Sequence, residues 1–317
     1  MEALEVLSPQ LLTQYEEKLP LIDHWVSVFN WSNGWHYDLD ILWILAQIEA
    51  RGLKKGATIL DAGAGLGVAQ FILASLGYNI ISLDFTYRNI PKFSESIFKI
   101  QLDQDRFDEG THSYMEFMNY GLKKNPIGNY FNFQKIYSAL KNPAKVQYIL
   151  NKKFRNYFNL SYFLERQKDH KDFGNITFLR GSFNKIPLPE NSVDMLISIS
   201  AFEHNTYDDM PASVKEFERV IKKDGLMLVT TSLAKEKDWF FEPSKGWNFT
   251  SETLQKWFDV KESKPIDFNS ALNEIRQSKY LEKRISPFYR FNGDNGLPFA
   301  KLSEAQYVPC GIAKHIS

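Results

Sequence analysis

The sequence predicts an α/β protein built on a parallel sheet, and two stretches carry that prediction. Residues 57–67 read as a buried strand that ends at Asp61 and runs into a glycine-rich loop. Residues 79–84 read as a second buried strand, which ends at Asp84. Apolar residues at helical spacing lie between them, so the order is strand, glycine loop, helix, strand and acid. That order is typical of a nucleotide-binding βαβ unit.

The spacing of the loop glycines bears on which nucleotide the unit binds. A dinucleotide fold carries G-x-G-x-x-G, with a helix N-terminus directed at a pyrophosphate. Here Gly63, Gly65 and Gly67 alternate, and Asp61 precedes them. A carboxylate at that place would repel a pyrophosphate and suits a ligand that carries an ammonium group.

This segment resembles motif I of the class I S-adenosylmethionine-dependent methyltransferases, and Asp84 matches their acid at the end of strand two. The resemblance implies S-adenosylmethionine as the cofactor and a seven-stranded sheet in the order 3-2-1-4-5-7-6. In that family the loop passes under the methionine and ribose, and the second acid holds the ribose hydroxyls. The cofactor residues implied in this half are Asp61, Gly63, Ala64, Gly65, Gly67, Asp84 and Phe85.

Length and composition limit the class of protein. A chain of 317 residues can form one large domain or a domain with an insertion. Lys plus Arg equals Asp plus Glu at 38 each, so no net charge attracts nucleic acid. The single cysteine, Cys310, excludes a disulfide framework and fits a reducing compartment. Neither a signal peptide nor a membrane-length apolar run is seen, so we expect a soluble cytoplasmic protein.

Residues 1–56 read as mostly helical, with a helix that ends near Gly52. Ahead of that helix lies an aromatic group of Trp25, Phe29, Trp31, Trp35, His36 and Tyr37. In the class I family this segment often covers the methionine end of the cofactor, a role that Tyr37 or Trp35 could take. The alternative is that the rings only cover the edge of the sheet.

Residues 87–173 interrupt the family pattern, and we predict that they form an inserted helical cap. The segment is rich in Phe and Tyr and more basic than acidic. Basic and aromatic residues together suit nucleic acid, an anionic lipid or a phosphorylated substrate, but an amphipathic helix with a solvated basic face is favoured. The predicted divisions are therefore 1–86 (N-terminal helices and first half of the core), 87–173 (cap and substrate region) and 174–317 (second half of the core).

From residue 174 the family pattern resumes. Residues 175–181 read as a strand, 186–204 as a loop and the fourth strand, and 222–232 as a turn and the fifth strand. This part is similar to small-molecule methyltransferases of the ubiquinone and sterol type, which hold the adenine amino group with an acid after a glycine. Ser182 stands at that position, so we expect the adenine contact at Ser182 or the Phe183 backbone, with Ser200 completing the cofactor site.

Three more elements are predicted towards the C-terminus. Residues 258–263 read as the sixth strand and 269–285 as helical. Residues 307–314 read as the last strand, which the resemblance makes antiparallel.

Methyl transfer is an in-line displacement in which the protein aligns the acceptor, excludes water and, for a hydroxyl, removes a proton. His204 follows the fourth strand, at the carboxyl edge where ligands of such sheets collect, and is the candidate base. Glu203 is a second candidate, as base or as orienting group. The alternative is that His204 caps the next helix or binds Glu203. No metal site is predicted.

The predicted function is transfer of a methyl group from S-adenosylmethionine to a small molecule, most simply at oxygen. The expected acceptor is apolar with an anionic group, and nucleic acid is not expected as a partner. Within enzymes the alternatives are methylation at nitrogen and of a glycan or lipid carrier. In another class, the chain would be a non-catalytic S-adenosylmethionine sensor or an RNA-binding protein.

Overall fold

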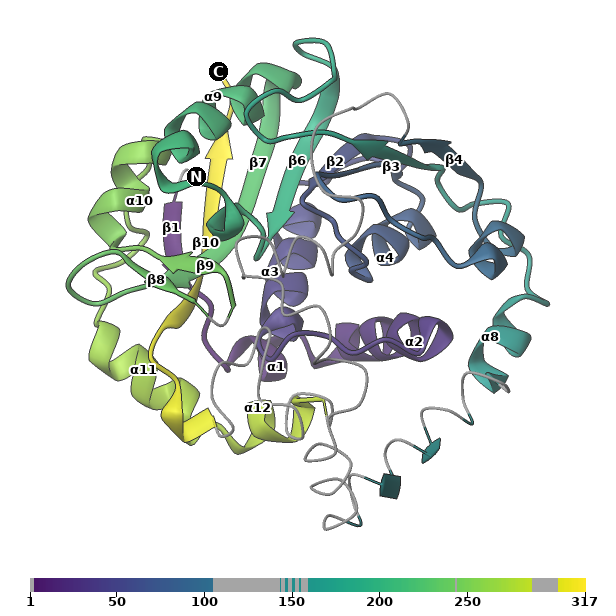
Figure 1. Cartoon of the computed structure of the whole chain (residues 1–317), viewed down its shortest axis with the longest axis horizontal. Helices are drawn as coiled ribbons and strands as arrows, with labels where there is room; N and C mark the ends of the chain where they lie inside the picture. The colour runs from purple at the N-terminus through teal and green to yellow at the C-terminus, as the bar shows by residue number, and fades with distance from the viewer. Residues whose placement is uncertain are drawn as a thin grey trace, which may run out of the picture.

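The computed structural model describes residues 3–104, 159–242, 244–286 and 302–317, with isolated positions between 143 and 154. At its centre lies an eight-stranded sheet in the order β1-β10-β7-β6-β2-β3-β5-β4 (Figure 1). The strands are β1 (Ala3–Val6), β2 (Thr58–Ala62), β3 (Asn79–Asp84), β4 (Ile100–Asp103), β5 (Ile176–Arg180), β6 (Val193–Ile199), β7 (Ile221–Leu233) and β10 (Val308–His315). A separate antiparallel pair consists of β8 (Trp239–Phe241) and β9 (Gly246–Asn248).

Helices cover both faces of the sheet, as an α/β fold requires to bury two apolar sheet surfaces. The α-helices are α1 (Leu11–Gln14), α2 (Leu19–Phe29), α3 (Tyr37–Ala50), α4 (Ala69–Ser75), α8 (Leu160–Glu165), α9 (Met210–Val220), α10 (Ser251–Phe258), α11 (Phe268–Gln277) and α12 (Lys279–Arg284). Short 3-10 turns are η1 (Glu16–Lys18), η2 (Lys92–Ser96), η3 (Phe202–His204), η4 (Tyr207–Asp209) and η5 (Leu302–Glu304). Side chains of α2, α3 and α4 fill the core on one face, and those of α9 and α10 fill it on the other.

The strand order reverses at β2, and this reversal positions the site. β2 pairs in parallel with β3 on one side and with β6 on the other. The chain therefore leaves β2 for one half of the sheet and later returns to build the other half. Ligands bind outside the carboxyl ends of the strands at such a switch point, which is where residues 63–67 lie.

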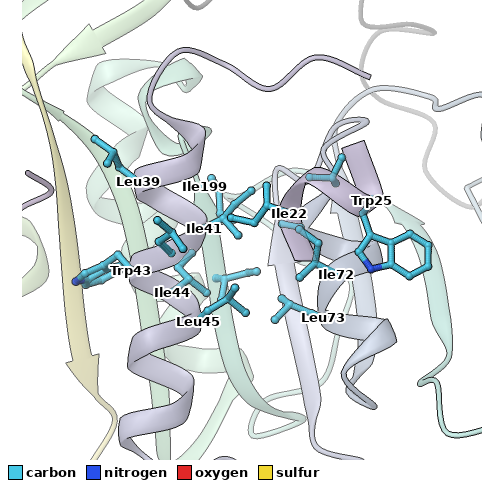
Figure 2. Close-up of a cluster of buried hydrophobic side chains, with 14 of the residues drawn as sticks. Ile22, Trp25, Leu39, Ile41, Trp43, Ile44, Leu45, Ile72, Leu73 and Ile199 are labelled. Carbon is cyan, nitrogen blue, oxygen red and sulfur yellow. The ribbon is translucent and has the colours of Figure 1, made fainter. Parts of the chain in front are cut away.

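Helix α3 is buried along almost its whole length and is fixed on the sheet by close packing. Figure 2 shows Trp43 pointing towards β10, while Ile44 and Leu45 lie on the side of α4. A Cβ on Gly311 of β10 would stand 2.7 Å from the Trp43 ring, so only glycine lets the indole lie flat on the strand. Because α3 is held this firmly, the residues at its N-terminal end have defined positions.

The sheet confirms the predicted α/β fold class. Read across the sheet, the strands β5, β3, β2, β6, β7 and β10 follow the predicted order 3-2-1-4-5-7. Its two edges differ from the prediction. Residues 258–263 do not pair with β10, because β1 takes that place and Leu4 N–H donates to the carbonyl of Lys261 at 2.8 Å. The physical reason is burial: Leu4 and Leu7 are completely buried and draw the N-terminal segment, predicted to be mostly helical, into the sheet.

At the opposite edge β4 pairs in parallel with β5 and adds an eighth strand. β4 and α8 belong to the segment 87–173. The residues between them, apart from the isolated positions, lie outside the described part of the chain, so the helical cap and the three-part division remain predictions. No helix in the described ranges is long and apolar enough to cross a bilayer.

Candidate active site

The glycine loop after β2 turns back onto β3 and touches the exits of two other strands. The N–H groups of Gly63 and Ala64 both donate to the carbonyl of Leu83, at 2.9 and 3.0 Å. Gly63 has a φ of +80°, and a Cβ there would stand 2.8 Å from the Phe183 ring and nearer still to Ala201. Glycine is thus required both by the backbone angle and by this packing. The fold thus brings together two predicted residues, Gly63 and Phe183, and places Ala201, the neighbour of the predicted Ser200, against them.

Asp84 fixes the loop through its side chain. One carboxylate oxygen, Oδ2, accepts the N–H of Gly65 at 2.8 Å. The other, Oδ1, accepts the N–H and the hydroxyl of Thr86 at 2.8 and 2.6 Å. A carboxylate has about four lone-pair sites, and the Gly65 and Thr86 donors take all but one, so Oδ2 of Asp84 can still accept a hydrogen bond from a ligand hydroxyl.

Arg88, which the sequence analysis did not single out, is buried beneath this loop at 3% exposure. Its guanidinium donates to the carbonyls of Ser82 and Leu179 at 2.6 and 2.9 Å and lies 5.1 Å from the centre of the Phe178 ring. Within the described residues its Nε has no hydrogen-bond partner. The one signal in the sequence was an arginine four residues after the acid of strand two.

Asp61 is also buried, next to Arg88 and Asp84. Burial raises the pKa of its carboxyl to about 7, against a lowering by Arg88 and with a further increase from Asp84. A carboxyl group with a pKa near neutrality becomes ionised when a cation binds beside it. The geometry therefore suits the ammonium-bearing ligand expected from the sequence.

On the predicted adenine side of the site, Ser182 and Phe183 both have contacts within the protein. Ser182 Oγ accepts the N–H of Asn184 at 3.2 Å and so stabilises its own turn. The Phe183 ring packs edge-on against Phe217, with 5.3 Å between ring centres. Phe85 is exposed at the end of β3, and its carbonyl accepts a hydrogen bond from Arg180 at 3.1 Å.

The exit of β6 is strained and polar. Ser200 has a positive φ of 44°, which is rare for a residue with a Cβ and is typical of functional sites. Its N–H donates to the Thr230 carbonyl at 3.0 Å, and its hydroxyl donates to Asp40 Oδ2 at 3.3 Å. Both contacts hold the predicted cofactor residue at the point where the chain leaves the sheet.

Glu203 and His204 follow in the turn η3. Glu203 is buried and accepts the Thr231 hydroxyl at 3.2 Å. Burial raises the pKa of Glu203, although His204 and His36 lower it and Asp40 raises it again. His204 Nδ1 lies 2.9 Å from the carbonyl of Lys245. Because a carbonyl only accepts, Nδ1 carries the proton, and Nε2 carries the lone pair of the neutral ring.

Trp35, His36 and Tyr37 of the predicted aromatic group lie at the N-terminal end of α3, the end at which Asp40 contacts Ser200. Tyr37 covers Gly34 so closely that a Cβ added to Gly34 would overlap the tyrosine ring. Trp35 is buried and donates its Nε1–H to the Tyr307 hydroxyl at 2.8 Å. Trp35 therefore packs in the core, and Tyr37 remains the candidate for covering the cofactor.

His36 and Asp40 form a buried pair that sequence reasoning missed. His36 Nδ1 lies 2.8 Å from Asp40 Oδ2, and the two residues are 4% and 0% exposed. Burial lowers the pKa of His36, but the Asp40 carboxylate and Glu203 outweigh it, so the pKa is raised. The available signal was their spacing of four residues on one helix face.

Among the described residues, no group of three or more His, Cys, Asp and Glu side chains is arranged to hold a metal ion.

Comparison with known proteins gives one family match. A family described as "Methyltransferase domain" matches residues 154–229, which run from the segment before α8 to β7. No curated protein matches the chain.

Several solved structures are distantly similar to it. The [4+2]-cyclase SpnF is 13% identical, with 99% of this chain and 98% of that chain covered and a TM-score of 0.45. The 1,6-didemethyltoxoflavin-N1-methyltransferase of Burkholderia thailandensis, solved with S-adenosylhomocysteine, is 11% identical over 86% and 76% of the two chains, with a TM-score of 0.42. A SAM-dependent methyltransferase of Aquifex aeolicus is 16% identical over 88% and 90%, with a TM-score of 0.37.

Proposed function

We propose that this chain is a class I S-adenosylmethionine-dependent methyltransferase and that it methylates a small molecule at an oxygen atom. The observation that carries the cofactor assignment is the arrangement of Asp61, Asp84 and the glycine loop at the carboxyl ends of β2 and β3. A loop held by a carboxylate, next to a second carboxyl ready to ionise, suits a ligand with ribose hydroxyls and an ammonium group.

In this proposal each residue of the cofactor site has one task. Asp84 accepts a ribose hydroxyl through Oδ2, and Asp61 faces the ammonium group. Gly63, Ala64, Gly65 and Gly67 let the backbone approach the ligand closely, while Ser182 and the Phe183 backbone border the adenine. Bound S-adenosylmethionine supplies the activated methyl group together with its own leaving group.

The acceptor has to lose a proton if it is a hydroxyl. His204 is the candidate base from the sequence, and its Nδ1–H bond to the Lys245 carbonyl places the lone pair of the neutral imidazole on Nε2. Glu203 lies next to it in the chain and would orient the acceptor or the imidazole.

The expectation of an anionic group on the acceptor stays a prediction. Two buried carboxyls near the β6 exit, Asp40 and Glu203, favour an acceptor that presents a hydrogen-bond donor. The same carboxyls would attract an amine, so methylation at nitrogen is the second candidate.

A cytoplasmic location is also part of the proposal, because the lone thiol of Cys310 suits a reducing compartment.

The test uses S-adenosylmethionine with a ¹³C-labelled methyl group and a low-molecular-weight metabolite extract. We expect the label to appear in an extract compound, with the chemical shift of a methyl carbon on oxygen. A shift typical of a methyl carbon on nitrogen would support the second candidate. The variant Gly65→Arg should transfer no label, because the side chain would fill the loop. Binding of S-adenosylhomocysteine without any transfer would identify a sensor instead.

A further inference from the structure

The His36–Asp40 pair has features that a simple helix start does not require. His36 is the residue before α3, and its Nδ1 is 2.8 Å from Asp40 Oδ2 one turn into the helix. Since a carboxylate only accepts, Nδ1 carries the proton and Nε2 carries the lone pair of the neutral imidazole. No described residue makes a hydrogen bond to Nε2.

Asp40 is satisfied on one side only. Oδ2 receives His36 and the Ser200 hydroxyl, whereas Oδ1 is buried without a hydrogen-bond partner among the described residues. A buried carboxylate oxygen without a donor is costly and rare in native proteins. A protein that retains such an oxygen commonly uses it in function, or fills the space with water or ligand.

Contacts connect this pair to the cofactor loop. Asp40 contacts Ser200, and the next residue, Ala201, packs directly against Gly63 of the loop. The pair therefore contacts the strained turn at Ser200, one residue before the alanine that packs against the glycine loop. His204 lies on the same exit but has a backbone carbonyl, not a carboxylate, behind its Nδ1.

We infer that His36, held and polarised by Asp40, is a second proton acceptor for the methyl acceptor, and that it carries more of this task than His204. This inference rests on the proposed function. The acceptor O–H gives its proton to Nε2 of neutral His36, while an oxygen lone pair forms the bond to the methyl carbon. The carbon–sulfur bond breaks, and its electrons return to sulfur, so S-adenosylhomocysteine leaves. Asp40 stabilises the imidazolium that results.

Several groups act on the ionisation of His36. Asp40 lies one turn into the adjoining helix α3, and Glu203 acts on His36 from the β6 exit. The rings of Tyr37 and Tyr307 lie beside it, with ring centres 5.8 and 6.2 Å away. The thiol of Cys310, on β10, is buried near the same two carboxyls. Burial and the carboxyls raise the pKa of Cys310, so this thiol stays neutral and adds no charge.

The test compares three histidine variants in the labelled-methyl assay with the extract. His36→Asn keeps a donor for Asp40 but has no group that takes a proton, and we expect turnover to fall about 10²-fold or more. His204→Asn should lose less than His36→Asn. His24→Asn changes a histidine on α2 that contacts Glu165 outside the site, so its turnover should equal that of the wild type even where the fold loses stability. The affinity for S-adenosylhomocysteine should change by no more than about threefold in all three variants.

A merely structural role for His36 is separated from catalysis by the pH profile. Wild-type turnover should fall on the acid side as His36 becomes protonated, and Asp40→Asn should move that limb to lower pH, because the carboxylate raises the pKa of His36. Normal turnover by His36→Asn, or a larger loss in His204→Asn, would overturn the inference. No transfer by the wild-type protein would instead contradict the proposed function itself.

Discussion

The Oδ2 atom of Asp84 accepts the backbone N–H of Gly65 at 2.8 Å, and this bond joins the end of β3 to the loop after β2. The same carboxylate holds Thr86 through its other oxygen. One side chain thus sets the conformation of the loop and presents the acceptor atoms for a ribose. Loop geometry and ligand binding are coupled through Asp84, which makes the site sensitive to small changes around it.

The first prediction concerns Gly63→Ala. The new Cβ would collide with Ala201 and the Phe183 ring in addition to the strain of a φ of +80°. Gly56→Ala is the matched control, because Gly56 has a φ of +85° and nothing within 4 Å of the added Cβ. Urea unfolding should show a loss of about 1–2 kcal/mol for Gly56→Ala and clearly more for Gly63→Ala. Equal losses would show that the packing against Ala201 is unimportant.

The second prediction concerns pH and Asp61. Its folded-state pKa, raised by burial to about 7, exceeds the ordinary value of 3.8, so the carboxyl destabilises the ligand-free fold as pH rises from 3.8 to 7. A bound ammonium reverses this preference because it favours the charged carboxylate. S-adenosylhomocysteine should therefore bind about tenfold more tightly at pH 8 than at pH 6. Asp61→Asn should flatten that dependence, and an unchanged slope in this variant would contradict the role of Asp61.

The third prediction concerns the buried cation. Arg88→Met removes the donors to two strand carbonyls and the positive charge between Asp61 and Asp84. We expect the free energy of unfolding to fall by about 3–5 kcal/mol, because the partners stay buried and lose their compensation. Lys279→Met, at an exposed side chain paired with Glu282, should change it by less than about 0.5 kcal/mol. A loss of similar size in both variants would show that Arg88 is not a structural centre of the site.

The fourth prediction concerns the attachment of α8 to α2. Glu165 is buried and bonded to His24, Lys168 and His170 at 2.9, 2.6 and 3.2 Å. Burial raises the pKa of Glu165, but Lys168 and the two histidines outweigh it and lower the pKa below the usual 4.5. Its contribution is therefore fully present above pH 4.5 and is lost as pH falls through the folded-state pKa.

Glu165→Gln should accordingly lower the free energy of unfolding by about 1–3 kcal/mol at pH 7. Chemical denaturation at several pH values measures this difference, which should shrink below pH 4.5. A difference that stays constant in acid would mean that the charge of Glu165 is not what holds α8.

Most of the central sheet could be predicted because its signals are local. A few residues suffice to predict each of three features: the apolar strand that ends at Asp61, the loop of alternating glycines, and the apolar strand that ends at Asp84. The antiparallel β10 also followed from the family pattern. The edge strand β1 could not be predicted, since four residues carry little pattern and pair with residues 310–313, far away in the chain.

The site was predictable only where a motif marks it. Arg88 and the His36–Asp40 pair have no motif, and their importance comes from partners brought close by folding, such as Leu179 for Arg88 and Ser200 for Asp40. A spacing of four residues is common on helix surfaces and does not reveal that both side chains are buried. Ser182 was predicted from the motif; its hydroxyl oxygen accepts the N–H of Asn184 in its own turn, and its contact with adenine stays a prediction.

The most direct test of the cofactor site is isothermal titration calorimetry of the whole chain with S-adenosylhomocysteine and, separately, with NADH. We predict binding of one S-adenosylhomocysteine per chain and no heat of binding with NADH. Asp84→Asn should weaken the affinity for S-adenosylhomocysteine about 10- to 100-fold, because one carboxylate oxygen becomes a donor, while Asp172→Asn, at an exposed position, should leave it unchanged. Tight binding of NADH with no response to S-adenosylhomocysteine would contradict the account.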